Sequence, residues 1–301
     1  MKLKFHTLDV FTAEPFTGNG LAVVLDADGL SDQRMQDIAR EFNLSETIFV
    51  QRPANEAHTA SVRIFMPGGE LPFAGHPTVG CAVLLASFKY KAGCSFETDI
   101  LLEEKAGLVP VKVSRLGSVA RAVFTAPVLP KKTGKAPPNS RIAEALGLSE
   151  EQIGFGGHRP AVFAAGNPFL FVPVSTMEAL APARVIEPYW SDMLGEAGTF
   201  SAYIYTAGGA RPDTAFRARL YAPGEGIPED PATGSGAATL PGQIHFHESL
   251  DDGRHGWHIE QGYEMGRPSH IAVEAEISGG SITAVRVGGQ AVHVSEGTIE
   301  F

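Results

Sequence analysis

Apolar and polar positions alternate in short blocks along the chain, and the period of the alternation changes from one block to the next. Residues 3–11 and 58–65 follow the two-residue period of a strand. In residues 31–42 the apolar positions recur at helical spacing behind Ser31, which can cap a helix. Residues 94–128 contain β-branched runs and few helix signals. The pattern predicts a mixed α/β chain with a strand-rich region before residue 130.

The most informative local stretch is residues 69–80, where a Pro- and Gly-rich turn delivers His76 and an apolar segment, residues 81–86, follows at once. This order is typical of a strand, a tight turn and the N-terminus of a buried helix. A helix N-terminus has free N–H donors and partial positive charge, so it can hold an anion such as a carboxylate. We therefore interpret His76 as a candidate substrate-contacting residue.

Features of the first half recur in the second half in the same order, which suggests an internal duplication. The matching pairs are residues 17–25 with 165–173, 45–49 with 201–205, 62–68 with 218–224, and 74–77 with 233–236. The last pair equates His76 with Ser235. We interpret the chain as two structurally similar halves, and we expect the two helix starts to face one cleft between them.

The domain boundary is predicted near residue 130, because residues 131–139 combine Pro, Gly and charge without an apolar period. This stretch is interpreted as a linker. The predicted domains are residues 1–130 and 131–289, and a length of 301 residues is sufficient for both.

Composition restricts the classes of partner and the compartment. The net charge of −10 argues against a nucleic-acid or anionic-membrane surface. Two cysteines provide no disulfide framework, the first residues lack a signal-type apolar core, and no stretch has membrane-spanning length. A soluble, cytoplasmic protein with a small-molecule partner is expected.

Two carboxylates are candidates for chemistry. Asp230 precedes the second glycine turn, in which Ser235 opens a helix; helix capping by Asp230 and Thr233 is an equally weighted alternative. Glu46 has no counterpart in the second half, where Ala202 follows the matching serine. A carboxylate in one half only is expected of an asymmetric acid/base. The alternative is a surface or strand charge, and catalysis near neutral pH requires partial burial.

Other signals are weaker. His245, His247 and Glu248 lack a recognisable metal-ligand spacing, and Asn19, between two glycines, is interpreted as a turn residue. The sequence contains no Walker A motif and no Rossmann glycine fingerprint. We expect neither a cofactor nor a metal.

At these residues the sequence resembles the PhzF family, the phenazine-biosynthesis-like proteins. The resemblance covers nearly the whole chain, and its motifs are residues 16–24, 43–49, 71–77, 229–235, Gln261-Gly262 and 265–269. It implies a diaminopimelate-epimerase-like fold: two similar α/β domains, each a mixed sheet rolled around a central helix, with the C-terminal strand, near residues 290–301, returning to the first domain.

The resemblance also implies an activity and a set of site residues. The characterised family member is a cofactor-free isomerase of dihydro-hydroxyanthranilate, usually a homodimer, in which one glutamate serves as acid and base. That glutamate corresponds to Glu46, and the other polar site residues correspond to His76, Asp230 and Ser235. The backbone at Gly75 and Gly234 is expected to contact substrate.

A related branch of the fold, the amino-acid racemases and epimerases, uses two cysteines at the helix starts. Ala74 and Thr233 stand at those positions here, and Cys81 lies too far along its helix, so racemisation by two thiols is disfavoured. The leading hypothesis is a cofactor-independent isomerase acting on a small carboxylate. The alternatives are a lyase or epimerase on a related acid, and a non-catalytic metabolite-binding protein.

Overall fold

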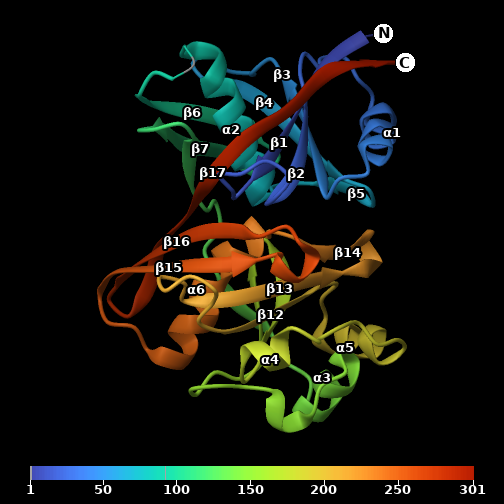
Figure 1. The fold of residues 1–301 in the computed structure, drawn as a ribbon, viewed down its shortest axis with the longest axis vertical. Helices are drawn as coiled ribbons and strands as arrows, with labels where there is room; N and C mark the ends of the chain where they lie inside the picture. The colour runs from blue at the N-terminus through green and yellow to red at the C-terminus, as the bar shows by residue number, and fades with distance from the viewer. Residues whose placement is uncertain (1, 92) are drawn as a thin grey trace. The chain divides into compact units, whose positions relative to one another are not determined.

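The computed structural model describes residues 2–91 and 93–301, and it divides the chain into two compact units (Figure 1). The first unit contains the chain up to Pro127 together with Gly266–His270 and Val287–Phe301. The second contains Val128–Met265 and Ile271–Arg286. The short return at 266–270 is not predicted by the sequence pattern.

The first unit is a sheet wrapped around one helix. Its elements are β1 (Lys2–Val10), β2 (Asn19–Val24), α1 (Asp32–Phe42), β3 (Glu46–Gln51), β4 (Ala60–Met66), β5 (Gly69–Leu71), α2 (Gly75–Lys89), β6 (Phe96–Glu104), β7 (Gly107–Arg115), β8 (Ala120–Thr125) and the later part of β17 (Ser281–Glu300). Strand β1 pairs antiparallel with β2 and with β17, and β17 also pairs with β8. The remaining pairs are β2–β3 and β4–β6, both parallel, and β3–β4, β6–β7 and β7–β8, all antiparallel, so the sheet closes on itself.

Helix α2 is the centre of this unit because it is apolar around its whole circumference and buried along most of its length. A Cβ at Gly80 would come within 2.6 Å of Leu21 Cδ2 and 2.7 Å of Val10 Cγ2, so only glycine lets the helix approach β1 and β2 this closely. Helix α1 is amphipathic, is capped by Ser31, and buries Met35 and Ile38 in a separate apolar cluster.

The second unit repeats this plan. Its elements are β9 (Lys131–Gly134), α3 (Asn139–Leu146), β10 (Ala161–Ala165), β11 (Asn167–Pro173), α4 (Met177–Leu180), α5 (Tyr189–Ala197), β12 (Ala202–Ala207), β13 (Phe216–Ala222), β14 (Ile227–Asp230), α6 (Gly234–Glu248), β15 (Gly253–Gln261), most of β16 (Ser269–Ser278) and the start of β17. Helix α6, like α2, is buried around most of its circumference.

The order and sense of strand pairing are the same in both units, which confirms the internal repeat. Strand β11 pairs parallel with β12, as β2 does with β3. Strands β12 and β13 are antiparallel, as β3 and β4 are, and β13 pairs parallel with β15, as β4 does with β6. In both units a short strand precedes the central helix. The predicted fold, a mixed sheet rolled around a central helix, is confirmed for each unit.

The interpretation of residues 131–139 as a linker is wrong in part. Residues 131–134 form strand β9, which pairs antiparallel with β10. Backbone groups make this ladder, so charged side chains that point to solvent do not prevent it.

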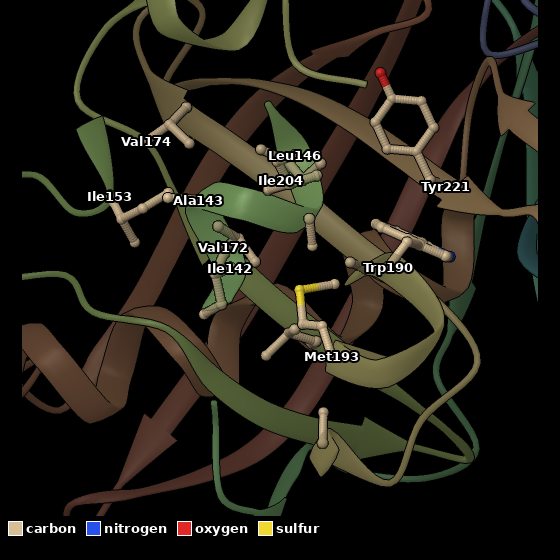
Figure 2. Packing of buried hydrophobic residues seen from close by; sticks show 14 of the residues in the cluster. Ile142, Ala143, Leu146, Ile153, Val172, Val174, Trp190, Met193, Ile204 and Tyr221 are labelled. Carbon is tan, nitrogen blue, oxygen red and sulfur yellow. The ribbon is translucent and has the colours of Figure 1, made fainter. Parts of the chain in front are cut away.

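A second apolar cluster stabilises the outer layer of the second unit (Figure 2). Ile142 and Leu146 of α3 face Val172 and Ile204 of the sheet, and the Trp190 ring of α5 packs edge-on against Tyr221, with the ring centroids 6.0 Å apart. In the described part of the chain no helix is long and apolar enough to cross a bilayer.

Candidate active site

Three polar residues of the first unit meet at the start of α2. Two of them, Glu46 and His76, are predicted site residues, and the third, Asn19, is not. Glu46 is the first residue of β3, and only 8% of it is exposed, so the surface-charge alternative is wrong. Its Oε2 lies 3.0 Å from Nδ1 of His76, the second residue of α2. The same nitrogen is 3.4 Å from Nδ2 of Asn19. Glu46, His76 and Asn19 therefore form one buried polar group.

His76 is a neutral imidazole in this environment. Burial lowers the pKa of His76 to about 3, because an imidazolium would lose its hydration there. The Asn19 amide nitrogen can only donate a hydrogen bond, so His76 Nδ1 accepts from it and the single N–H of the neutral imidazole is on Nε2. The 3.0 Å approach of Glu46 Oε2 to Nδ1 is a close polar contact without hydrogen-bond geometry.

The structure corrects the interpretation of Asn19. It is not a turn residue: it is the first residue of β2, is 1% exposed, and contacts His76. Its counterpart in the repeat, Asn167, is exposed at the start of β11. Asn19 is buried and Asn167 is exposed, so the two units differ at this position. They differ in the same way at Glu46, whose counterpart is Ala202.

The buried carboxyl group of Glu104 supports the start of α2 through a contact with Thr78. Thr78 Oγ1 lies 2.7 Å from the carbonyl oxygen of Ala74 and 2.6 Å from Oε1 of Glu104, the last residue of β6. One hydroxyl proton cannot serve both acceptors, so a protonated Glu104 completes the pair of bonds. Burial raises the pKa of Glu104 to about 8, with the Thr78 hydrogen bond opposing the rise, which agrees with that protonation state.

In the second unit Asp230 and Thr233 form the turn before α6. Thr233 Oγ1 donates to Asp230 Oδ2 at 2.7 Å, and only 4% of Asp230 is exposed. Thr233 occupies the N-cap position, but its side chain makes no hydrogen bond with an α6 amide. The capping interpretation is therefore wrong for Thr233, whose hydroxyl fixes the Asp230 carboxylate instead.

Gln261, the last residue of β15, holds this turn in place. Its Nε2 donates to the Asp230 carbonyl at 2.8 Å and lies 2.9 Å from Thr233 Oγ1, while its Oε1 accepts from the Thr233 amide at 3.2 Å. The side chain is fully buried. Its position at the end of a strand, 28 residues from Thr233, gives no local pattern from which its role could be predicted.

The structure leaves Ser235 accessible. Ser235 is the second residue of α6 and is partly exposed, and its hydroxyl makes no hydrogen bond within residues 2–91 and 93–301. Gly234 precedes it as the first residue of α6, as Gly75 precedes His76 in α2. Neither helix start has a side-chain cap among the described residues, so both present backbone N–H donors.

A tight contact explains why position 236 of α6 is a glycine. A Cβ there would lie 2.7 Å from the ring of Tyr203, which is fully buried. Burial raises the pKa of the Tyr203 phenol, with the nearby Asp230 carboxylate adding to the rise, so Tyr203 stays protonated.

Burial also raises the pKa of the Cys81 thiol, so this cysteine is not a thiolate base. This environment agrees with the presence of Ala74 and Thr233, and not cysteine, at the two helix starts.

Residues 8–297 match the family model described as "Phenazine biosynthesis-like protein". The chain belongs to this family. A protein of Mesorhizobium japonicum, named as an uncharacterized isomerase, is 43% identical, and the match covers 97% of this chain and 96% of that protein. The trans-2,3-dihydro-3-hydroxyanthranilate isomerase of Pseudomonas aeruginosa is 35% identical over 98% of each chain.

The crystal structure of a PhzF-family protein of Bacillus anthracis has the same fold. It superposes with a TM-score of 0.88 over all of both chains at 23% identity. The family membership and fold that the sequence motifs predict are therefore confirmed for this PhzF-family chain.

Proposed function

We propose that this PhzF-family protein is an isomerase that moves a proton within a small carboxylate substrate, with Glu46 as both acid and base. The observation that carries the proposal is the buried contact between Glu46 Oε2 and His76 Nδ1 at 3.0 Å. A carboxylate that is buried beside a neutral imidazole has the environment that acid–base catalysis by a glutamate requires. The relatives named as isomerases support the same reaction class.

In the proposed reaction Glu46 removes a proton from an acidified C–H bond. The electron pair of that bond enters the adjacent π system, the double bonds move, and Glu46 returns the proton to a second carbon. The atoms and charges balance within one molecule, so the step needs no external oxidant or reductant. General acid–base catalysis of this kind contributes roughly 10²–10⁴-fold to the rate.

The other candidate residues have binding roles in this proposal. The backbone N–H groups at Gly75 and Gly234 begin two helices of 15 residues each, and their positive ends favour a carboxylate. Asp230, fixed by Thr233 and Gln261, accepts hydrogen bonds from polar substituents of the substrate. The unpartnered hydroxyl of Ser235 donates or accepts as the substrate requires.

The substrate named for the P. aeruginosa relative is the first compound to test. Purified protein is incubated in D₂O with trans-2,3-dihydro-3-hydroxyanthranilate and, separately, with a panel of small unsaturated carboxylates, and products are followed by NMR. The proposal predicts a product of unchanged mass, apart from deuterium, that depends on Glu46.

The competing functions give different results in this experiment. A lyase changes the mass by loss of a fragment, and an epimerase inverts one centre without moving a double bond. A metabolite-binding protein leaves every compound unchanged while ligand resonances broaden; that result for all compounds would overturn the proposal.

A further inference from the structure

A cluster of metal-ligating side chains lies in the first unit on the strand pair β1–β17. His6 is in β1, and His293 and Glu296 are in β17. His6 Nδ1 is 3.0 Å from His293 Nε2 and 3.5 Å from Glu296 Oε2, and one donor atom from each residue lies within 4.8 Å of the other two. None of the three belongs to the candidate active-site residues, and no metal is expected here from the sequence pattern.

A β-bulge places His293 on the same face as the other two side chains. The antiparallel register pairs His6 with Glu296 and Thr7 with Ser295, but the next pair is Leu8 with His293, so Val294 is extra. In a regular strand His293 and Glu296, three residues apart, would point to opposite faces. The bulge corrects this offset, which is a recognised means of redirecting a side chain.

The donor set matches a borderline divalent metal. Two imidazoles and one carboxylate form the three-ligand pattern of zinc sites that keep one position open. Two ligand atoms bound to one tetrahedral zinc at about 2.0–2.1 Å each are separated by about 3.3–3.4 Å. Two of the observed separations, 3.0 and 3.5 Å, bracket this value, and the third pair of donor atoms lies within 4.8 Å, so side-chain rotations would bring the three atoms around one ion.

The surroundings leave space for the open position and fix one ligand. His6 is 7% exposed and its ring packs on Phe88, with the ring centroids 5.5 Å apart, while His293 and Glu296 are exposed. A cavity of about 490 Å³ is lined in part by His6, Phe88 and Glu296. Lys4 also lines it and opposes a cation, but its ammonium is exposed to water, which screens the repulsion.

We propose that His6, His293 and Glu296 form a zinc-class metal site with one coordination position open to this cavity. The first and last strands of the chain lie side by side there (Figure 1), so a bound ion would cross-link them. An ion that binds only the folded chain raises its stability by mass action. The proposal does not depend on the proposed isomerase activity.

The alternative is a simple hydrogen bond between two imidazoles, and metal titration separates the two. Full-length protein is stripped with chelator and titrated with Zn²⁺ by calorimetry, alongside His293→Ala, Glu296→Gln and the control His255→Ala. His293 and Glu296 are exposed, so their substitution is compatible with folding. His255 lies in β15 and bonds the Asp251 carbonyl, outside the cluster.

The proposal predicts one zinc per chain, at least tenfold weaker binding in each cluster variant, and unchanged binding in His255→Ala. Co²⁺ should give visible absorption bands of a tetrahedral site in the parent chain and lose them in His293→Ala. Zn²⁺ should raise the Tm of the parent more than that of His293→Ala. The absence of saturable binding, or equal affinity in the parent and both cluster variants, would overturn the proposal.

Discussion

The starts of α2 and α6 are built from the same backbone plan but carry different chemistry. Each helix follows a short strand, begins at a glycine, and is supported by the last residue of the strand that comes next in the chain. In the first unit that residue is Glu104, a buried acid bonded to Thr78. In the second it is Gln261, an amide bonded to Thr233 and Asp230.

This difference shows how two copies of one fold can carry two separate roles, proton transfer and substrate binding. The first helix start has Glu46, His76 and Asn19 in contact, a group that can take up and release a proton. In the second unit Ala202 occupies the first position of β12, where β3 has Glu46, and Asn167 is exposed. The polar residues of the second unit, Asp230 and Thr233, are hydrogen-bonded to each other, and they are suited to binding substrate.

The largest expected effect tests this division. Glu46→Gln removes the proton-accepting group and should lower kcat by roughly 10²–10⁴-fold. Asp230→Asn and Ser235→Ala should act mainly on KM, by about tenfold. Steady-state kinetics on an identified substrate measure both parameters, with the exposed Glu97→Gln as the matched control. A similar loss of kcat in all three site variants would contradict the division of roles between the two units.

The next prediction concerns the pH dependence of stability at Glu104. Its pKa is about 8 in the folded chain against an ordinary value of 4.5, so between these pH values the unfolded chain releases a proton that the folded chain retains. The contribution of Glu104 to the free energy of unfolding therefore falls as pH rises through this window, by at most about 1.4 kcal/mol per pH unit.

Glu104→Gln should remove that dependence and gain stability relative to the parent from pH 5 to pH 8. Urea unfolding at several pH values measures the difference between the two proteins. A difference that stays flat, or that favours the parent as pH rises, contradicts the assignment of a neutral Glu104.

Gln261→Leu should destabilise the second unit by about 2–4 kcal/mol. The substitution keeps the volume but leaves the Thr233 amide and the Asp230 carbonyl buried without their partner. Glu104→Leu should cost less near pH 8, because Thr78 keeps its bond to Ala74. Denaturant unfolding of both variants at pH 8 compares them, and an equal cost would mean that the two supports are equivalent.

Gly80→Ala and Gly236→Ala should each cost roughly 1–3 kcal/mol, because the new Cβ meets packed side chains in either helix. Gly236→Ala should also weaken substrate binding, since its neighbour is Ser235. The exposed Gly195→Ala in α5 meets nothing within 4 Å and should gain up to about 1 kcal/mol. Thermal unfolding checks all three; a stabilised Gly80→Ala would contradict the close packing.

The smallest expected effect is the absence of a titration. Because the pKa of His76 is about 3, its ring should remain neutral between pH 5 and 8. Ring ¹⁵N chemical shifts of His76 should stay constant over that range. A His76 midpoint near 6.5 would show that the site is more hydrated than its burial indicates.

The sequence predicted the parts of the fold that depend on local pattern and repetition. Apolar spacing and a capping serine located α1, and the repeated motifs placed the two central helix starts near His76 and Ser235, one residue from the observed starts at Gly75 and Gly234. Strand β9 was missed because its ladder is formed by backbone groups. Asn19 was misread because a Gly-Asn-Gly sequence is typical of turns, and only tertiary contact with His76 reveals its environment.

Contacts between residues that lie far apart in the sequence could not be predicted from local patterns. Glu104 is 26 residues from Thr78, and His6 is 287 residues from His293, so no spacing rule relates them. The bulge at Val294 reverses the face on which His293 would be placed by strand alternation. The arrangement of the two helix starts around one substrate stays a prediction.

The most direct test of the central claim is to follow one proton. Substrate carrying deuterium at the carbon that loses hydrogen is incubated with the parent, Glu46→Gln and Ser235→Ala, and NMR locates the label while calorimetry measures binding. We predict that the label leaves its carbon with the parent and with Ser235→Ala, and stays with Glu46→Gln although substrate still binds. Transfer by Glu46→Gln within tenfold of the parent rate would contradict the assignment of Glu46 as the base.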